Sequence, residues 1–303
     1  MPFPQQVTIV GLGLMGGSLA LALRPHIAKL IAVDANPLTC RQAEAQGVVD
    51  WATTDLARGV AGSGLVILAT PVRVIARLLA QLPLLRPDGC LVLDLGSTKT
   101  AITQAMSQLP ASFAAVGGHP MCGRETSGLN AADAALYEGQ TFILCETARS
   151  TATAKAIVGQ LLAWLGAAPL WLDSRQHDAY VAVVSHLPYV VSAALLRRAA
   201  QEADEDPRLW QVSASGFRDT GRLAGSEPRM MLDILLTNRE AVLAQLSHFQ
   251  SHLAEIAALI EAEDEVALRH WLAARQFEYG IYRSHKPPRG EEDNPGASKA
   301  PGL

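Results

Sequence analysis

The stretch that decides the fold is Val7-Thr8-Ile9-Val10-Gly11-Leu12-Gly13-Leu14-Met15-Gly16, near the amino terminus. It begins with a β-branched run, which favours a buried strand, and continues into a GxGxxG pattern. The next residues, 17–23, have the length and composition of a helix. A strand, a glycine-rich turn and a helix in this order predict a dinucleotide-binding unit.

Each glycine of this pattern has a structural role. Gly11 permits the tight turn, Gly13 lets the backbone approach a pyrophosphate, and Gly16 allows the helix to pack closely against the strand. The free N–H groups and the dipole of the helix would face the phosphates. Leu14 and Met15 complete this part of the predicted cofactor site. The alternative is a glycine-rich turn without a ligand.

An acidic residue follows the second predicted strand. Asp34 lies near the spacing of about 20 residues expected for an acid that binds the adenosine ribose hydroxyls. Its carboxylate would repel a 2′-phosphate, and Ala35 and Asn36 supply no arginine, so the sequence predicts NAD rather than NADP. Thr70 and Pro71 follow another apolar strand. They are predicted to contact the cofactor at the carboxyl edge of the sheet.

Residues 1–172 alternate short apolar runs with helical patterns, as expected for a parallel sheet covered by helices. The predicted strands are residues 7–10, 30–33, 65–69, 91–95, 114–117, 141–145 and 169–172. The predicted helices are residues 17–23, 37–46, 72–81, 98–108 and 151–165. The fold class is therefore α/β, with a Rossmann-type, doubly wound and mostly parallel sheet.

After Asp173 the strand signals end, and the chain continues as an all-helical domain. The predicted helices are residues 174–203, 232–261 and 265–277. We expect a Rossmann NAD-binding domain over residues 1–172, a helical domain over 173–283 and a disordered tail over 284–303. An apolar stripe within residues 242–259 must be buried, either against this chain or against a partner subunit.

Composition excludes several kinds of protein. The chain has 303 residues, of which 49% are hydrophobic and 18% charged, so it can bury more than one core. Its 25 Lys and Arg against 29 Asp and Glu give a net charge of −4, which makes nucleic acid an unexpected partner. The four cysteines form no CxxC pair, so we expect neither disulfides nor a metal site, and a cytoplasmic location. Residues 185–188 interrupt the longest apolar stretch of the second half, so no membrane segment is expected.

Two further predicted strands end in polar residues. Asp94-Leu95-Gly96-Ser97-Thr98-Lys99 follows one strand, and Gly117-Gly118-His119-Pro120-Met121-Cys122-Gly123 follows the next. In a parallel sheet, Ser97 and His119 emerge on the edge where the nicotinamide would lie. A histidine there can accept a proton near neutral pH. The alternative is that His119 has a structural role and takes no part in catalysis.

In these residues the chain resembles the prephenate and arogenate dehydrogenases of tyrosine biosynthesis. The resemblance extends from residue 7 to about residue 282, and its order of motifs is more specific than any single one. The motifs are GLGLMGGS from Gly11, TP at Thr70, DLGSTK from Asp94, GGHPMCG from Gly117, SHLPY from Ser185 and GFRDTGRLA from Gly216. Without a recognisable chorismate mutase segment or regulatory ACT domain, we expect a monofunctional member.

The resemblance implies an NAD(P)-dependent oxidative decarboxylation, from prephenate to 4-hydroxyphenylpyruvate or from arogenate to tyrosine. It implies that His119 deprotonates the 4-hydroxyl of the substrate, and that Ser97 bonds both this hydroxyl and His119. His186 would contact the substrate side chain, and Arg222 would hold a substrate carboxylate. Asp219 could receive the ammonium group of arogenate.

The resemblance also implies a homodimer built through the helical domain, with a small molecule as substrate. Two other functions stay open. A β-hydroxyacid dehydrogenase would match at the cofactor end, but residues 174–277 lack the lysine which that family places in its helices. A non-catalytic NAD-binding sensor would share the fold alone. For Arg222 the alternative role is a salt bridge to Asp219.

Overall fold

The order and direction of the strands in one sheet position the candidate site. The computed structural model describes residues 2–124 and 126–285, which include eight strands in the order β3-β2-β1-β4-β5-β6-β7-β8. They are β1 (Gln6–Val10), β2 (Lys29–Val33), β3 (Trp51–Thr53), β4 (Leu65–Leu68), β5 (Leu91–Asp94), β6 (Ala114–Pro120), β7 (Thr141–Cys145) and β8 (Ala168–Trp171). Neighbours from β3 to β6 are parallel, β7 is antiparallel to β6, and β8 is parallel to β7. The strand order reverses between β1 and β4, where such sheets bind nucleotides.

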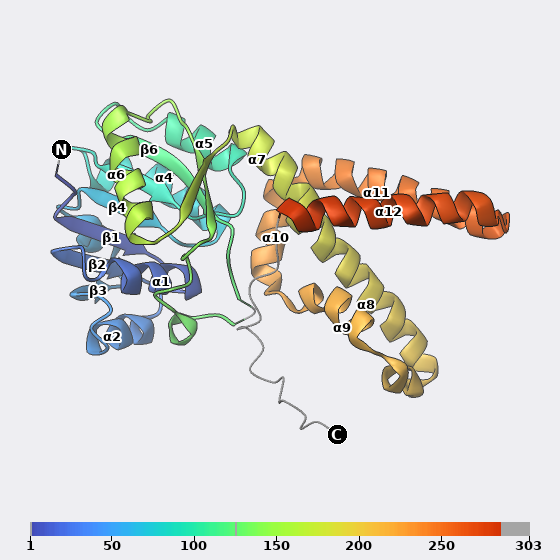
Figure 1. The fold of residues 1–303 in the computed structure, drawn as a ribbon. Helices are drawn as coiled ribbons and strands as arrows, with labels where there is room; N and C mark the ends of the chain where they lie inside the picture. Colours follow the sequence, from blue (N-terminus) through green and yellow to red (C-terminus); the bar gives the residue numbers. More distant parts are fainter. Residues whose placement is uncertain (1, 125, 286–303) are drawn as a thin grey trace, which may run out of the picture. The chain divides into compact units, whose positions relative to one another are not determined.

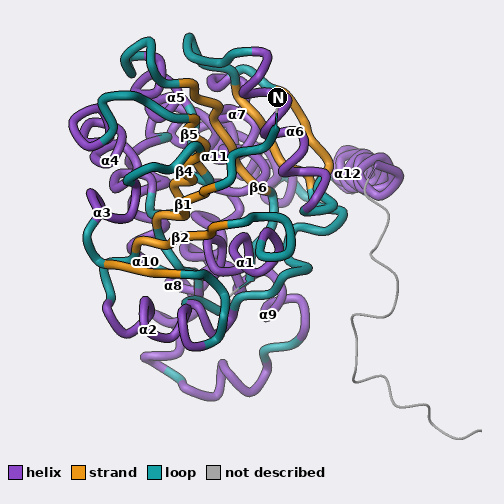
Figure 2. The backbone as a smooth tube through the Cα atoms, turned by 90° about the vertical axis from the view of Figure 1, so that its left-hand side faces the viewer, coloured by secondary structure: helices purple, strands orange, loops and turns teal. Residues whose placement is uncertain are grey.

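Helices pack on both faces of this sheet. They are α1 (Leu14–Leu23), α2 (Pro37–Ala45), α3 (Leu56–Val60), α4 (Val72–Leu85), α5 (Thr100–Ser107) and α6 (Ala152–Trp164). Figure 2 shows α1 and α6 on one face, and α3, α4 and α5 on the other. One buried cluster includes Leu19 and Leu161, and the other includes Ile75 and Ile102. Two apolar layers thus enclose the sheet and leave its strand ends for polar groups.

The predicted fold class is confirmed, and the differences concern short elements. β3 and α3 were not predicted, because three and five residues are too few to show a period. β6 extends to Pro120, beyond the predicted end at residue 117. This extension places His119 within the strand rather than in a following loop.

The chain after the sheet is helical (Figure 1). Its elements are α7 (Ser174–Val181), the π-helical turn η2 (Ala182–His186), α8 (Leu187–Glu205), η3 (Pro207–Val212), α9 (Ser215–Gly221), η4 (Arg222–Gly225), α10 (Pro228–Thr237), α11 (Arg239–Glu261) and α12 (Glu265–His285). The single helix predicted over residues 232–261 is wrong, because Asn238 separates α10 from α11. Asn238 leaves the helical region with φ −118° and ψ 30°, and its side-chain amide donates to the Asp178 carbonyl at 2.7 Å.

The chain divides into two compact units, Met1–Gln245 and Leu246–Leu303. The first unit holds the sheet together with α7 to α10, and the second holds α12 and most of α11. The three predicted domains stay a prediction. α12 continues through Ser284 and His285, two residues of the predicted tail. The remainder of that tail, residues 286–303, lies outside the described residues.

By length and hydropathy alone, the helical stretch Ser174–Glu205 could cross a membrane. Interior helices of proteins that never enter a bilayer share this composition. The beginning of this stretch packs against the start of α5, because Asp178 accepts hydrogen bonds from the N–H groups of Lys99 and Thr100. The expected lack of a membrane segment stays a prediction.

Candidate active site

Packing shapes the turn between β1 and α1. Gly11 has a φ of +100°, and a Cβ on it would lie 2.6 Å from the Ala69 carbonyl oxygen. A Cβ on Gly16 would lie 1.9 Å from the Gly11 carbonyl oxygen. A Cβ on Gly13, by contrast, would have nothing within 4 Å. The turn is therefore closed where it packs and open where a pyrophosphate would approach.

Two groups beside this turn suit a dinucleotide. α1 begins at Leu14, and its N-cap Gly13 provides no side-chain hydrogen bond, so the helix terminus can serve a phosphate. Asp34 accepts from the Leu12 N–H at 2.8 Å through one oxygen and from the Asn36 N–H at 2.9 Å through the other. These bonds fix the carboxylate and leave each oxygen a lone pair for a ribose hydroxyl.

The end of β4 supplies a further polar group. Thr70 follows this strand, and its Oγ1 is buried without a hydrogen-bond partner among the described residues. A buried hydroxyl without a partner costs about 1–3 kcal/mol, so a bound polar group would restore that energy. Pro71 then caps α4 with a φ of −53°. Together with the open turn at Gly13, this hydroxyl fits the NAD site predicted from the sequence.

Residues 128–137, including η1 (Leu129–Ala131), support the start of α1. The Tyr137 hydroxyl donates to the Met15 carbonyl at 2.7 Å, and the Asp133 N–H donates to Ser18 Oγ at 2.9 Å. This support was not predicted, since the segment has neither a strand nor a helix period.

A buried ion pair joins the ends of β5 and β6. Asp94 and Lys99 have fully buried side chains and contact each other. Asp94 also accepts from the N–H groups of Gly96 at 2.7 Å and Gly118 at 3.0 Å, and Lys99 Nζ donates to the Gly118 carbonyl at 2.7 Å. The loop that carries Ser97 is therefore tied to the strand that carries the catalytic candidate.

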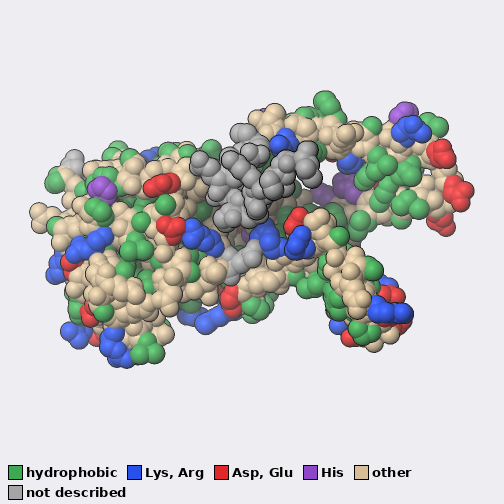
Figure 3. Space-filling model, turned by 60° about the horizontal axis from the view of Figure 1, so that its bottom comes forward, with side chains coloured by type: hydrophobic (Ala, Val, Ile, Leu, Met, Phe, Trp, Pro, Cys, Tyr) green, Lys and Arg blue, Asp and Glu red, His purple; other side chains and the backbone are tan. Residues whose placement is uncertain are grey.

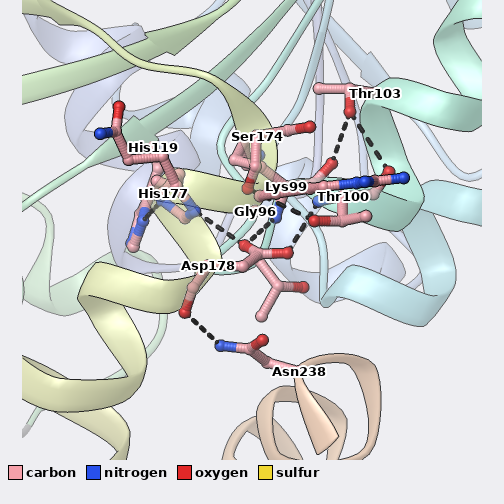
Figure 4. Close-up of polar contacts among 12 residues, drawn as sticks. Gly96, Lys99, Thr100, Thr103, His119, Ser174, His177, Asp178 and Asn238 are labelled. Carbon is pink, nitrogen blue, oxygen red and sulfur yellow. Dashed lines mark hydrogen bonds and ion pairs between the residues drawn. The ribbon is translucent and has the colours of Figure 1, made fainter. Parts of the chain in front are cut away.

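His119 lies half-buried near the end of β6 and contacts a second histidine (Figure 4). Its Nδ1 is 2.8 Å from His177 Nε2, and His177 Nδ1 is 2.8 Å from Asp178 Oδ1. Asp178 accepts from the N–H groups of Lys99 at 2.7 Å and Thr100 at 2.8 Å. A continuous chain of hydrogen bonds thus connects His119 with the first residues of α5.

The charges around His119 favour its neutral form. Burial lowers the pKa of His119 well below the ordinary histidine value. A positive charge on His177, Lys99 or His186 would lower it further. Burial alone would raise the pKa of Asp178, but hydrogen bonds from His177 and from the Thr100 and Lys99 backbone hold it below its ordinary value. A neutral imidazole and an ionised carboxylate therefore face each other across His177.

His186 lies in the π-helical turn and is 1% exposed. The Asn238 side-chain nitrogen is 3.2 Å from His186 Nδ1, and because an amide nitrogen only donates, Nδ1 accepts. Burial lowers the pKa of His186 to about 4, so the ring is neutral at physiological pH. Its predicted contact with the substrate side chain stays a prediction.

The remaining predicted substrate residues lie on separate elements. Arg222 opens η4 and Asp219 lies on α9, and both are exposed. η4 is held to α8 because the Ala224 N–H donates to buried Ser192 Oγ at 3.0 Å. Asp219 forms no ion pair within the described part of the chain, so the alternative salt bridge to Arg222 is not found.

Ser97 is half-buried, and its hydroxyl makes no hydrogen bond to any residue that the structure describes. Its predicted bond to His119 stays a prediction.

His177 and Asp178 were not predicted, since two polar residues at the start of a helix carry no signal of a distant partner. Their one signal is that two polar residues on the inward face of a helix need hydrogen-bond partners when they are buried.

Two family models match most of the chain. The model described as prephenate dehydrogenase, nucleotide-binding domain, matches residues 19–169. The model described as prephenate dehydrogenase, dimerization domain, matches residues 173–274. The prephenate dehydrogenase of Lactococcus lactis subsp. cremoris is 33% identical over 273 residues, which cover 88% of this chain and 74% of that protein.

Solved structures show the same similarity. The prephenate dehydrogenase from A. aeolicus, in complex with hydroxyphenyl propionate and NAD+, has a TM-score of 0.84 and 31% identity, covering 92% of this chain and 98% of that chain. The Synechocystis arogenate dehydrogenase has a TM-score of 0.78 and 32% identity, covering 91% of this chain and 99% of that chain.

Proposed function

The chain belongs to the prephenate dehydrogenase family, and we propose that His119 is the general base with which it oxidises its substrate. It is an NAD-dependent oxidoreductase that oxidatively decarboxylates prephenate or arogenate in tyrosine biosynthesis. Membership sets aside the β-hydroxyacid dehydrogenase and the non-catalytic sensor. One observation carries the proposal: His119 lies near the carboxyl end of β6, at the same edge of the sheet as the glycine-rich turn after β1.

The chemistry requires few groups from the protein. Bound NAD supplies the hydride acceptor. The substrate loses a hydride from the ring carbon that bears the hydroxyl, and the C–C bond to the ring carboxylate breaks to release carbon dioxide. The electron pair of that bond enters the ring, which becomes a phenolate. His119 takes the hydroxyl proton and returns it to the phenolate oxygen, so the reaction needs no net proton.

The other predicted residues would orient a dianionic substrate. We assign Ser97 to the hydroxyl that His119 deprotonates, and His186 to the substrate side chain. Arg222 suits a planar carboxylate because a guanidinium donates two parallel hydrogen bonds. Asp219, on the helix just before Arg222, is our candidate for the ammonium group of arogenate. A positive charge near the carboxylate that leaves as carbon dioxide must bind it. This charge must not stabilise the bound substrate more than it stabilises the transition state.

Gly11, Gly13, Leu14, Met15 and Gly16 form the proposed seat of the NAD pyrophosphate. The open face at Gly13 and the uncapped terminus of α1 support this assignment. For the rest of the cofactor we assign Asp34 to the adenosine ribose, with Thr70 and Pro71 lining the nicotinamide side. The fixed negative charge of Asp34 supports NAD over NADP.

We assign the substrate and dimer contacts to residues 173–283. The match to a dimerization domain supports a homodimer, as do hydrophobic side chains exposed on the helical elements (Figure 3). Among them are Val183, Val184, Leu195 and Leu196. All four cysteines are free thiols, which supports a cytoplasmic location. The net charge of −4 supports a small-molecule substrate without nucleic acid as a partner.

The test offers prephenate and arogenate separately to the purified protein, each with NAD and with NADP, and follows the absorbance of the reduced cofactor. We expect turnover of at least one substrate with NAD, and a fall in kcat of about 10²–10⁴-fold in His119→Asn. His26→Asn is the matched control, since His26 is exposed at the opposite edge of the sheet. Binding of NAD without turnover of either substrate would contradict the proposal, as would a His119→Asn variant with normal kcat.

A further inference from the structure

His177 and Asp178 have no part in the reaction described above, yet His177 contacts the proposed base and Asp178 contacts His177. The His177 side chain is fully buried, with Nε2 2.8 Å from His119 Nδ1 and Nδ1 2.8 Å from Asp178 Oδ1. Asp178 receives two more hydrogen bonds, from the N–H groups of Lys99 and Thr100. Figure 4 shows the two rings and the carboxylate in this order. The three side chains form one line of contacts behind the base.

The positions of the hydrogens follow from the carboxylate end of this line. Asp178 accepts from two backbone N–H groups, and despite burial hydrogen bonds hold its pKa below the ordinary value, so its carboxylate is ionised and can only accept. His177 Nδ1 therefore carries the hydrogen that it shares with Asp178. A His177 ring that holds only this one hydrogen has a lone pair at Nε2. The hydrogen between the rings therefore belongs to His119 Nδ1, which leaves His119 Nε2 without one.

We propose that His177 and Asp178 are positioning residues that hold His119 in the tautomer with its hydrogen on Nδ1, so that Nε2 is the proton acceptor. The inference rests on the proposed function of His119 as the base. An imidazole without a fixed partner populates both tautomers, and the tautomer with hydrogen on Nε2 would meet the substrate hydroxyl as a donor. The contacts of His177 remove that unproductive state.

The same contacts act during proton transfer. The O–H bond of the substrate breaks, its electron pair stays on oxygen, and an N–H bond forms at His119 Nε2. The imidazolium that results faces His177 on α7, Lys99 before α5 and His186 in the π-helical turn. Asp178 supplies negative charge through His177, which accepts from His119 Nδ1. Because this cation exists only after proton transfer begins, its stabilisation changes kcat more than KM.

Variants of His177 separate positioning from packing. His177→Phe keeps a ring but removes the acceptor, whereas His177→Gln keeps a side-chain carbonyl that can accept from His119. We expect His177→Phe to lower kcat about 10²-fold while each KM changes less than about threefold. His177→Gln should recover about tenfold of that loss. His26→Phe is the control, since it makes the same change on an exposed residue stacked on Trp164.

Nitrogen-15 NMR of histidine-labelled protein tests the tautomer directly in the wild type, whether or not the variants fold. With NAD bound, His119 should carry hydrogen on Nδ1 and none on Nε2 near neutral pH. A hydrogen on Nε2, or wild-type kcat in His177→Phe, would overturn the inference. If the wild type oxidised neither substrate while His119 showed the expected tautomer, the proposed function would fail and the positioning by His177 would stand.

Discussion

Replacing Lys99 with methionine should lower the free energy of unfolding by about 3–5 kcal/mol, because it leaves a buried carboxylate without its counter-charge. The side chains of Asp94 and Lys99 are both 0% exposed, so water cannot solvate the remaining charge. Asp94 would keep two hydrogen bonds, from the N–H groups of Gly96 and Gly118. Methionine has nearly the length of lysine, so the lost ammonium, rather than a cavity, dominates the change.

Urea unfolding followed by circular dichroism measures this loss, with equal m-values required in both proteins. Lys155→Met is the matched control, because Lys155 pairs with Glu146 in an exposed contact worth about 0–1 kcal/mol. The double variant Asp94→Asn/Lys99→Met should be more stable than the sum of the two single losses predicts, by about 1–3 kcal/mol. A loss in Lys99→Met no larger than in Lys155→Met would refute the reasoning.

Three further predictions concern the cofactor site and pH. Gly16→Ala should prevent folding or NAD binding, because its Cβ would lie 1.9 Å from the Gly11 carbonyl oxygen. Gly13→Ala has open space at its Cβ, so it should fold normally and weaken only the binding of NAD. Thermal unfolding with and without NAD measures both effects. Asp34→Asn keeps an acceptor for the Leu12 N–H but loses the charge, so the preference for NAD over NADP in kcat/KM should fall about tenfold or more; an unchanged preference would contradict this role. Because burial lowers the pKa of His186 to about 4, the stability that its neutral form contributes is complete above the unfolded-state pKa and is lost as the pH falls toward 4. That loss is about 3 kcal/mol, so urea midpoints should drop less between neutral pH and pH 4 in His186→Gln than in the wild type.

The cofactor turn could be predicted from the sequence because its parts are local. Gly11 lies in the turn with a positive φ, and Gly16 lies in the first turn of α1 without space for a Cβ. Both requirements are visible in the residue type itself. The support for this turn could not be predicted in the same way. Tyr137 donates to the Met15 carbonyl across 122 positions of sequence. Asn238 likewise ends α10 inside a stretch predicted as one helix, and its side chain bonds to the distant Asp178 carbonyl.

By itself the sequence determined the alternation of strands and helices, the glycine fingerprint with its acid, and the strand end that carries His119. These features follow from periodicity and residue type, which act over a few neighbouring residues. Only the tertiary structure decided which ring nitrogen of His119 contacts His177. His119 and His177 are 58 positions apart, and the assignment depends on which atoms of a strand, a helix and a carboxylate come within hydrogen-bond distance. The period of the apolar residues predicts which face of an element is buried, but it does not predict which polar atoms contact each other there.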